Sequence, residues 1–354
     1  MENSELTITA DTGGHNWSVP VLHFKGRDKT AAKVYMQAAL HASELPGTAV
    51  LHFLCQMLRY AEAQGQIAGD ITIIPQANPI GTAQNIYMQS QGRFDNASGI
   101  NFNRDFPLVA LKDRETLLDT GKLQTATQNL KNNLIYMALD ADIVIDLHCD
   151  YEALLYAYVC EEFWPDCKDF AAAMNVDCVF LADGQSTAFE EAVAYAFRSD
   201  SGENKPRRFV TTLELRGLSD VDETVAKHDA EGLFKFLTGR GVITGSDQQK
   251  SQQPQPDWNG SVTPLDNIEV IRAEHSGTVL FNRNIGDTVK TGDLLATIIT
   301  APGEENGTYQ VKAPQDGIFV TRANYRYAAR GDQLCKIACN APSTKERTPG
   351  TLES

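Results

Sequence analysis

Short apolar runs alternate with segments of helical periodicity over the first 245 residues. Residues 5–40 predict early strands separated by turns, and the later apolar runs predict strands at 70–75, 141–148, 154–160, 176–181 and 208–214. Apolar residues at helical spacing predict helices over 48–63, 123–140, 187–198 and 222–238. Several predicted strands carry few polar positions, which is typical of a sheet covered on both faces. We therefore expect an α/β domain over residues 1–245.

The pattern changes after a polar stretch at 246–260, which we interpret as a linker. Residues 261–340 consist of short apolar runs punctuated by glycines in two similar halves, and they predict an all-β module. This module resembles the barrel-sandwich hybrid of biotinyl and lipoyl carrier domains. The modified lysine of those carriers would fall at Asn306, so the resemblance extends to the fold and not to the modification. Residues 341–354 predict a disordered tail.

Charge and composition argue against several classes of partner and location. The 31 basic and 46 acidic residues give a net charge of −15, which disfavours nucleic acids and anionic membranes as partners. No run of eighteen apolar residues predicts a membrane-spanning helix, and the acidic N-terminus does not resemble a secretory signal. Seven scattered cysteines without a Cys-x-x-Cys pair are typical of reduced thiols. We expect a cytoplasmic protein.

Candidate metal ligands follow the predicted strands. His41 and Glu44 lie in the turn after the run 34–40, while His148 and Glu214 each end a later strand. Ligands of open α/β sheets bind beyond the carboxyl ends of the strands. Two imidazoles and a carboxylate, with water as the fourth ligand, form a common catalytic zinc site. We expect one zinc ion per chain at His41, Glu44 and His148, with Glu214 as the general base.

Further candidates lie in a polar loop over residues 82–107. Arg104 can bind a substrate carboxylate bidentately, and Asn103 offers an amide beside it. Arg93 can stabilise the oxyanion that forms on the scissile carbonyl. Asp146, two residues before His148 on the same face of a strand, is placed to support that ligand.

Four motifs in order complete the picture: His41-x-x-Glu44, Asn101-x-Asn103-Arg104-x-Phe106-Pro107, Asp146-Leu147-His148 and Leu213-Glu214-Leu215-Arg216-Gly217. Over residues 30–240 the chain resembles the succinylglutamate desuccinylase/aspartoacylase branch of the zinc carboxypeptidase-like hydrolases. The resemblance implies a mixed sheet flanked by helices, zinc at the three ligands, Glu214 as base and acid, and Asn103-Arg104 as a carboxylate clamp. The aspartoacylase arginine that polarises the carbonyl lies eight residues before the clamp arginine. Here position 96 is Asn, and Arg93 lies eleven residues before Arg104.

These patterns predict a zinc-dependent amidohydrolase that deacylates a small N-acylated amino acid or related amine. Zinc-bound hydroxide would attack the amide carbonyl. A metallocarboxypeptidase acting on short peptides could use the same residues. A zinc-bearing binding or regulatory protein is the alternative from another class, although such a protein has no need of the base Glu214. Plainer interpretations also exist, because Glu214 could pair with Arg216, and Arg104 with Asp105 or Asp146. The sequence leaves open whether the chain forms a homo-oligomer.

Overall fold

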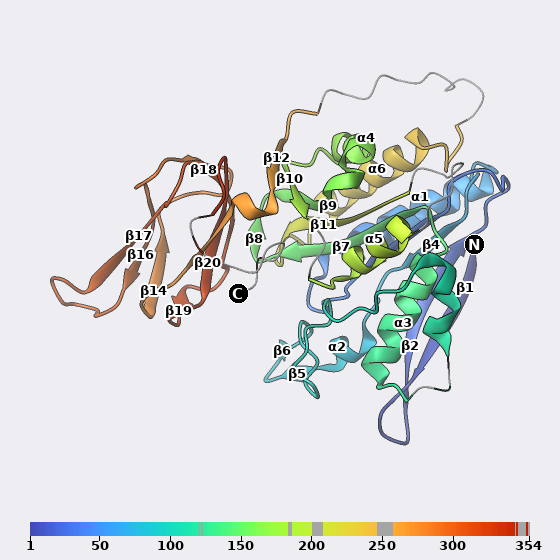
Figure 1. Ribbon diagram of the computed structural model, residues 1–354, viewed down its shortest axis with the longest axis horizontal. Helices are drawn as coiled ribbons and strands as arrows, with labels where there is room; N and C mark the ends of the chain where they lie inside the picture. The colour runs from blue at the N-terminus through green and yellow to red at the C-terminus, as the bar shows by residue number, and fades with distance from the viewer. Residues whose placement is uncertain are drawn as a thin grey trace.

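The structure is a computed structural model of the chain, and it describes residues 1–119, 121, 123–182, 186–199, 208–245, 258–343, 345 and 352. It has a large α/β part and a smaller all-β part, which lie side by side (Figure 1). Most of the predicted linker (246–260) and of the predicted tail (341–354) falls outside the described residues. The division into these segments stays a prediction.

A nine-stranded mixed sheet forms the centre of the α/β part. In pairing order its strands are β1 (Glu2–Thr9), β2 (Asn16–Phe24), β4 (Ile71–Ile74), β3 (Val34–Ala38), β7 (Ile143–Asp150), β11 (Phe209–Gly217), β9 (Leu155–Cys160), β10 (Cys178–Ala182) and β12 (Ser261–Pro264). The central strands β4, β3, β7 and β11 are parallel, while β9 runs antiparallel to β11. The carboxyl ends of β3, β7 and β11 therefore meet at one edge of the sheet.

Helices cover both faces of this sheet, as the buried central strands predict. The helices of one face are α1 (Pro46–Ala63), α4 (Trp164–Met174) and α6 (Glu223–Gly239), and those of the other are α3 (Ala126–Ala138) and α5 (Phe189–Ser199). Shorter elements are α2 (Pro79–Ala83), the 3-10 helices η1 (Leu111–Leu118) and η2 (Glu161–Phe163), and the hairpin β5 (Asn85–Ile86) and β6 (Gln89–Ser90). The hydrophobic pattern did not predict α4.

Two antiparallel four-stranded layers form the all-β part, which we call the β module (residues 268–339). Its strands are β13 (Ile268–Arg272), β20 (Gln333–Cys339), β18 (Gly317–Arg322) and β15 (Thr288–Val289) in one layer, and β17 (Thr308–Lys312), β16 (Leu294–Ile299), β14 (Gly277–Phe281) and β19 (Tyr327–Ala328) in the other. We expected the module to begin at residue 261, but residues 261–264 form β12 and pair with β10 of the large sheet. The 3-10 helix η3 (Leu265–Asn267) connects the two parts. Asn306 lies in the turn between β16 and β17, and the likeness to carrier domains stays a prediction.

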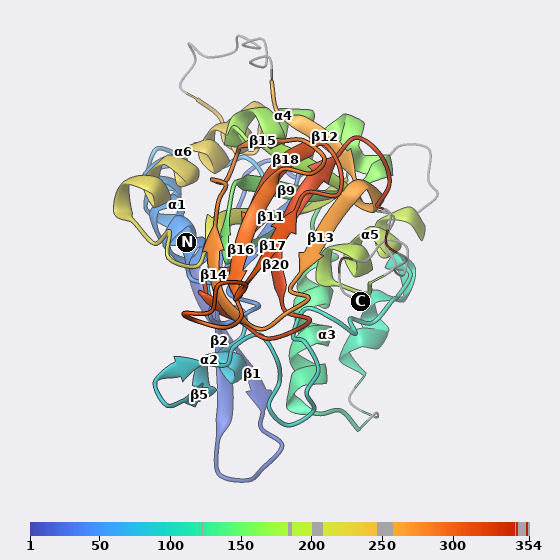
Figure 2. The ribbon, with the colours of Figure 1, turned by 90° about the vertical axis from the view of Figure 1, so that its left-hand side faces the viewer.

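The β module is joined to the large sheet by paired backbone and by ion pairs. The short strand β8 (Glu152–Ala153), which follows β7, pairs with β18 of the module. The Glu152 carboxylate binds the guanidinium groups of Arg322 and Arg326, at 2.6 and 2.7 Å. Lys336 of β20 lies 2.6 Å from a carboxylate oxygen of Asp150 at the end of β7. Seen from the module side, its strands lie in front of the carboxyl ends of the central strands (Figure 2).

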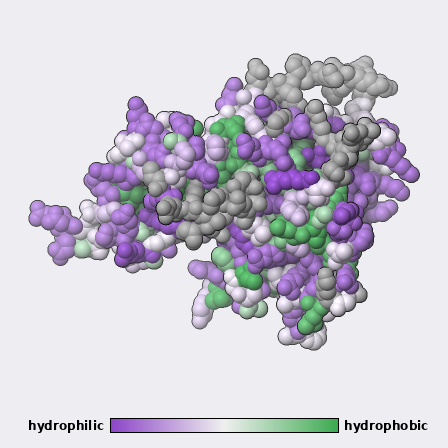
Figure 3. Space-filling model, in the orientation of Figure 1, coloured by the Kyte–Doolittle hydropathy of each residue, from purple (hydrophilic) through white to green (hydrophobic). Residues whose placement is uncertain are grey.

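The face seen in Figure 3 is mostly hydrophilic, with hydrophobic residues confined to small patches. Among the described residues, no helix is both long enough and apolar enough to cross a lipid bilayer.

Candidate active site

The turn that follows β3 places the first two predicted ligands. Ala39 takes the left-handed backbone conformation (φ 55°), which ends the strand. The Asn78 amide then donates to the Leu40 carbonyl at 2.8 Å, and the Glu44 N–H donates to the His41 carbonyl at 2.9 Å. One hydrogen bond within the turn and one from the neighbouring Asn78 therefore fix its conformation, and the side chains of His41 and Glu44 are buried.

Close packing at the start of α1 keeps this turn above the end of β7. A Cβ atom on Gly47 would lie 2.8 Å from the Cβ of Leu147 and 3.0 Å from that of Ala38. Real Cβ atoms do not approach so closely, so the helix reaches its position because residue 47 has no side chain. The consequence is that Glu44 lies beside His148, although 104 residues separate them in the chain.

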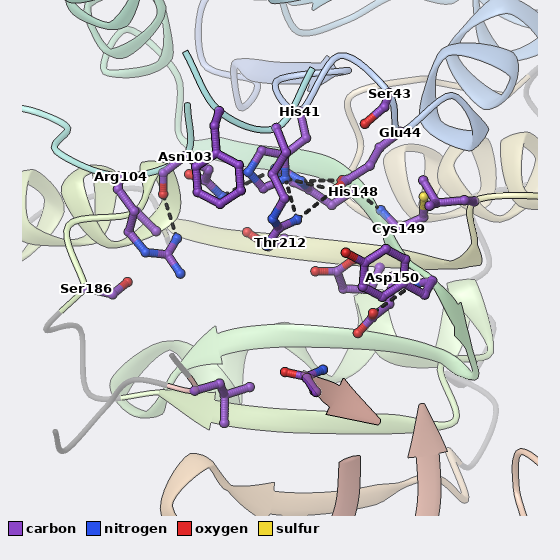
Figure 4. A pocket seen from close by; sticks show the side chains of 18 of the residues that line it. His41, Ser43, Glu44, Asn103, Arg104, His148, Cys149, Asp150, Ser186 and Thr212 are labelled. Atoms are coloured by element: carbon purple, nitrogen blue, oxygen red, sulfur yellow. Dashed lines mark hydrogen bonds and ion pairs between the residues drawn. The ribbon is translucent and has the colours of Figure 1, made fainter. Parts of the chain in front are cut away.

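The three predicted ligands converge on one point (Figure 4). One Glu44 carboxylate oxygen lies 2.8 Å from Nδ1 of His41, and the other lies 2.8 Å from Nδ1 of His148. All three ligand atoms lie within 4.8 Å of one another, and the residues are at most 4 % exposed. Two imidazole nitrogens and a carboxylate form the donor set of many catalytic zinc sites. These side chains could hold one metal ion.

Each imidazole is oriented through its second nitrogen. Nε2 of His41 lies 2.7 Å from the side-chain oxygen of Asn101, and Nε2 of His148 lies 2.9 Å from a carboxylate oxygen of Asp146. When Nε2–H donates to an oxygen, Nδ1 keeps its lone pair for a metal. The role of Asp146 was predicted from the sequence. That of Asn101 was not, although its position in the Asn101-x-Asn103 motif was the available signal.

A buried chain of hydrogen bonds supports Asp146. The Gln37 amide donates to Asp146 at 3.0 Å, and the Tyr35 hydroxyl donates to the Gln37 side-chain oxygen at 2.7 Å. Tyr35, Gln37 and Asp146 are all 0 % exposed. Gln37 was not predicted, although a polar residue inside an apolar strand was a visible signal.

The charges of the cluster are mutually stabilising. Burial alone would raise the pKa of Glu44, but the imidazoles of His41 and His148 outweigh it and hold that pKa well below its usual range. Burial would lower the pKa of His148, yet the carboxylates of Asp146 and Glu44 raise it well above the ordinary value. Burial lowers the pKa of His41. Glu44 is therefore an ionised carboxylate, as a metal ligand must be.

The predicted base Glu214 lies beside the ligands. It pairs with His148 in the register of β7 and β11, so the two side chains project from the same face of the sheet. Its Oε2 atom is buried and has no hydrogen-bond partner among the described residues. Burial, reinforced by Glu44, raises the pKa of Glu214 to about 8, against the lowering effect of His148. Arg216 does not pair with it, because a bulge turns this arginine towards Asp229.

Arg93 reaches the same cluster. Its Nη1 atom lies 3.1 Å from a Glu44 carboxylate oxygen and 3.3 Å from Nδ1 of His41. Gly92 makes this approach possible, because its carbonyl accepts from the Ala42 N–H at 2.9 Å and a Cβ atom there would lie 2.8 Å from the Cβ of Ala42. The loop that carries Arg93 is thus packed directly on the ligand turn.

The predicted clamp, Asn103-Arg104, is held from two helices. The Asn103 side-chain oxygen accepts from the Phe189 N–H of α5 at 2.8 Å, and its amide nitrogen lies 3.5 Å from Nε2 of His148. The Lys131 ammonium of α3 donates to the Arg104 carbonyl at 2.7 Å. The Arg104 guanidinium donates to the Asn103 carbonyl at 2.6 Å. Lys131 was missed, although a lysine on the apolar face of a predicted helix was the signal.

One cavity of about 820 Å³ brings these groups together. Besides the ligands, Glu214, Arg93, Asn103 and Arg104, its walls include the acidic residues Glu190 and Glu191 and the β-module residues Arg272, Tyr325, Gln333 and Lys336. Tyr325 donates its hydroxyl to the Gln333 carbonyl, while Tyr327 is 66 % exposed. The β module therefore forms one wall of the cavity.

Comparisons with known proteins agree with this geometry. The sequence model of the succinylglutamate desuccinylase/aspartoacylase catalytic domain matches residues 30–240, more than half of the chain. N-α-acetyl-L-2,4-diaminobutyric acid deacetylase from Halomonas elongata is 24% identical over 300 residues, which cover 84% of this chain and 79% of that protein.

Solved structures share the fold over nearly the whole chain. A succinylglutamate desuccinylase/aspartoacylase family protein from Shewanella amazonensis superimposes with a TM-score of 0.82 at 24% identity, covering 96% of this chain and 99% of that one. The product-bound ectoine utilization protein EutE from Ruegeria pomeroyi gives a TM-score of 0.70 at 18% identity, covering 95% and 93%. These matches include the β module as well as the catalytic part.

Proposed function

Since the chain belongs to the succinylglutamate desuccinylase/aspartoacylase family, we propose that it is a zinc-dependent deacylase acting on a small N-acylated amino acid or related amine. The family and the deacetylase relative support a hydrolase that acts on an amide bond. One observation carries the finer proposal. His41, Glu44 and His148 converge on one point. Glu214, whose Oε2 atom has no hydrogen-bond partner among the described residues, lies beside them in the same cavity.

The metal fits its three ligands by donor type and by the oriented imidazoles. When bound there, zinc supplies a Lewis acid that lowers the pKa of a water molecule to about 7. Glu214 takes the proton from the attacking water and later transfers it to the leaving nitrogen. Glu214 is placed for this exchange because it lies beside the ligands and its Oε2 atom has no hydrogen-bond partner among the described residues.

Two arginines of the loop act on the substrate. The Arg93 guanidinium, placed beside Glu44 and His41, hydrogen-bonds the carbonyl oxygen as negative charge develops on it. The Arg104 guanidinium binds the carboxylate of the amine part. Its Nη1 atom donates to the Asn103 carbonyl, and Lys131 holds the Arg104 backbone carbonyl. Fixing the substrate at two points orients the scissile bond towards the attacking water.

The β module favours small substrates over peptides. Its residues Arg272, Tyr325 and Lys336 line the cavity opposite the catalytic part, and paired strands and a buried ion pair hold the module there. A long peptide would need to pass this wall. This wall supports a small substrate over a long peptide, and the comparison of N-acetyl compounds with dipeptides separates a deacylase from a carboxypeptidase that acts on short peptides.

A combined metal and activity measurement tests the proposal. The purified protein, reconstituted with zinc, is expected to bind one zinc ion per chain and to hydrolyse N-acetyl amino acids or N-acetyl diamines faster than dipeptides. Glu214→Gln should keep the zinc and lose about 10²- to 10⁴-fold in kcat. His148→Asn should lose the zinc itself. Full zinc binding without turnover on any of these compounds would favour a binding protein, and faster dipeptide cleavage would favour a carboxypeptidase.

A further inference from the structure

Glu190 is a buried acid in the cavity that the mechanism above does not use. It is the second residue of α5, it is 8 % exposed, and it lines the same cavity as the metal ligands and Glu214. The Thr212 hydroxyl donates to its Oε2 atom at 2.8 Å. Thr212 lies two residues before Glu214 on β11, so both side chains project from the same face. Glu190 is therefore anchored about 7 Å along the strand from the base.

Among the described residues, Glu190 has a hydrogen bond from Thr212 but no paired cation. No lysine or arginine among the described residues forms an ion pair with it, and Glu191 and Asp146 add like charge nearby. Burial first, and then Glu191, raises the pKa of Glu190 to about 7. A buried carboxylate with one hydrogen bond reduces the stability of a fold, so its presence in a substrate cavity indicates a ligand that compensates for it.

Its neighbour Glu191 has a different environment. The Glu191 carboxylate accepts from the N–H and the hydroxyl of Ser186, at 2.5 and 2.8 Å, and so holds the segment before α5. This is a structural role, and it leaves Glu190 as the acid of α5 that is available to a ligand.

Glu190 is also linked to the clamp. The Phe189 N–H, which directly precedes Glu190, donates to Asn103, and the Arg104 charge lowers the pKa of Glu190. An acid and a base thus face the same cavity beside the cleavage site. Such a pair is complementary to a small molecule that carries both a carboxylate and an ammonium group.

We propose that Glu190 is a specificity-determining residue that binds a free ammonium group of the substrate while Arg104 binds its carboxylate. The preferred substrates are then mono-N-acylated diamino acids, which keep one ammonium after acylation. This inference rests on the proposed deacylase function. N-acyl amino acids with neutral side chains leave Glu190 unpaired and react more slowly.

The test compares two isosteric substrates, N-α-acetyl-2,4-diaminobutyrate and N-acetylnorvaline, which differ by an ammonium in place of a methyl group. For the zinc-loaded wild-type enzyme we expect kcat/KM to be at least tenfold higher for the diaminobutyrate compound. In Glu190→Gln this compound should lose about 10- to 100-fold in kcat/KM, while N-acetylnorvaline changes less than about threefold. Glu190→Asp should restore part of the preference. Equal loss on both substrates in Glu190→Gln would overturn the inference.

Calorimetric binding of the free products separates this inference from the proposed reaction. Wild-type protein should bind 2,4-diaminobutyrate at least tenfold more tightly than norvaline, and Glu190→Gln should bind both within about threefold. The control is Glu161→Gln, which makes the same change at an exposed acid of η2. Should Glu190→Gln fail to fold, Thr212→Val removes the anchoring hydroxyl and should weaken the same preference. No hydrolysis but selective product binding would refute the deacylase and keep the ammonium site, whereas hydrolysis of both substrates at equal rates would do the reverse.

Discussion

Replacing Glu190 by Gln should stabilise the protein at alkaline pH, which is unusual for a buried residue of an active site. Burial and the charge of Glu191 raise the pKa of Glu190 from its ordinary value of 4.5 to about 7. Because the folded state then binds more protons than the unfolded state between these values, stability falls as pH rises from about 4.5 to 7 and levels off above. Asp146 reinforces this penalty, and Arg104 and Thr212 reduce it.

The difference between the two pKa values corresponds to about 3 kcal/mol at about 1.4 kcal/mol per pKa unit. Glutamine carries no charge, and its side-chain oxygen can still accept from Thr212. We therefore expect Glu190→Gln to be more stable than wild type by about 1–3 kcal/mol at pH 8.5, and the advantage should fall below about 1 kcal/mol at pH 5.

Urea denaturation followed by circular dichroism at pH 5, 6, 7 and 8.5, at one fixed zinc concentration, measures this difference. Glu161→Gln, the exposed control, should show no pH-dependent gain. A constant loss of stability at every pH in Glu190→Gln would mean that the carboxylate makes favourable contacts in the free protein. That result would refute the argument that Glu190 is kept for a ligand.

Three further substitutions test the supporting structure. Asn101→Ala removes the acceptor of the His41 Nε2–H, so zinc affinity measured by chelator competition should fall about 10- to 100-fold, and an unchanged affinity would exclude this orienting role. Lys336→Met leaves Asp150 as an unpaired buried charge, so urea denaturation should show a loss of about 3–5 kcal/mol, which a second change, Asp150→Asn, should largely recover. Gly47→Ala should displace the start of α1 and lower both zinc affinity and stability, whereas a fully active and stable variant would contradict the close approach to β3 and β7.

The sequence predicted the centre of the fold well because its strands are buried on both faces. Predicted strands at 70–75, 141–148 and 208–214 correspond to β4, β7 and β11 within a few residues, and the mixed sheet flanked by helices is confirmed. The helix α4 was missed because its start carries Trp164, Pro165 and Asp166, which interrupt the apolar periodicity. The strand β12 was assigned to the β module because pairing partners at an edge cannot be read from periodicity.

The candidate site was predictable where a motif lies at a strand end and unpredictable where geometry depends on loops. His41, Glu44, His148 and Glu214 lie together because parallel strands end at one edge, and the structure brings them together as expected. Glu190 had no such signal, since acids in the first turn of a helix are ordinary helix-stabilising residues. The catalytic roles of the four strand-end residues stay proposals, as do the cytoplasmic location and any oligomer.

The joint between the two parts has a consequence for catalysis. Lys336 of the β module pairs with Asp150 at the end of β7, and its charge also lowers the pKa of Glu214. A buried ion pair contributes little net stability, but the fold is strongly destabilised when one partner moves away and leaves the other charge buried alone. The pair therefore specifies one position of the module against the sheet. The cavity wall and the base are thereby set by the same contact. The β module therefore forms part of the cavity wall, and we expect its removal to expose Glu214 and to leave Asp150 without its Lys336 partner.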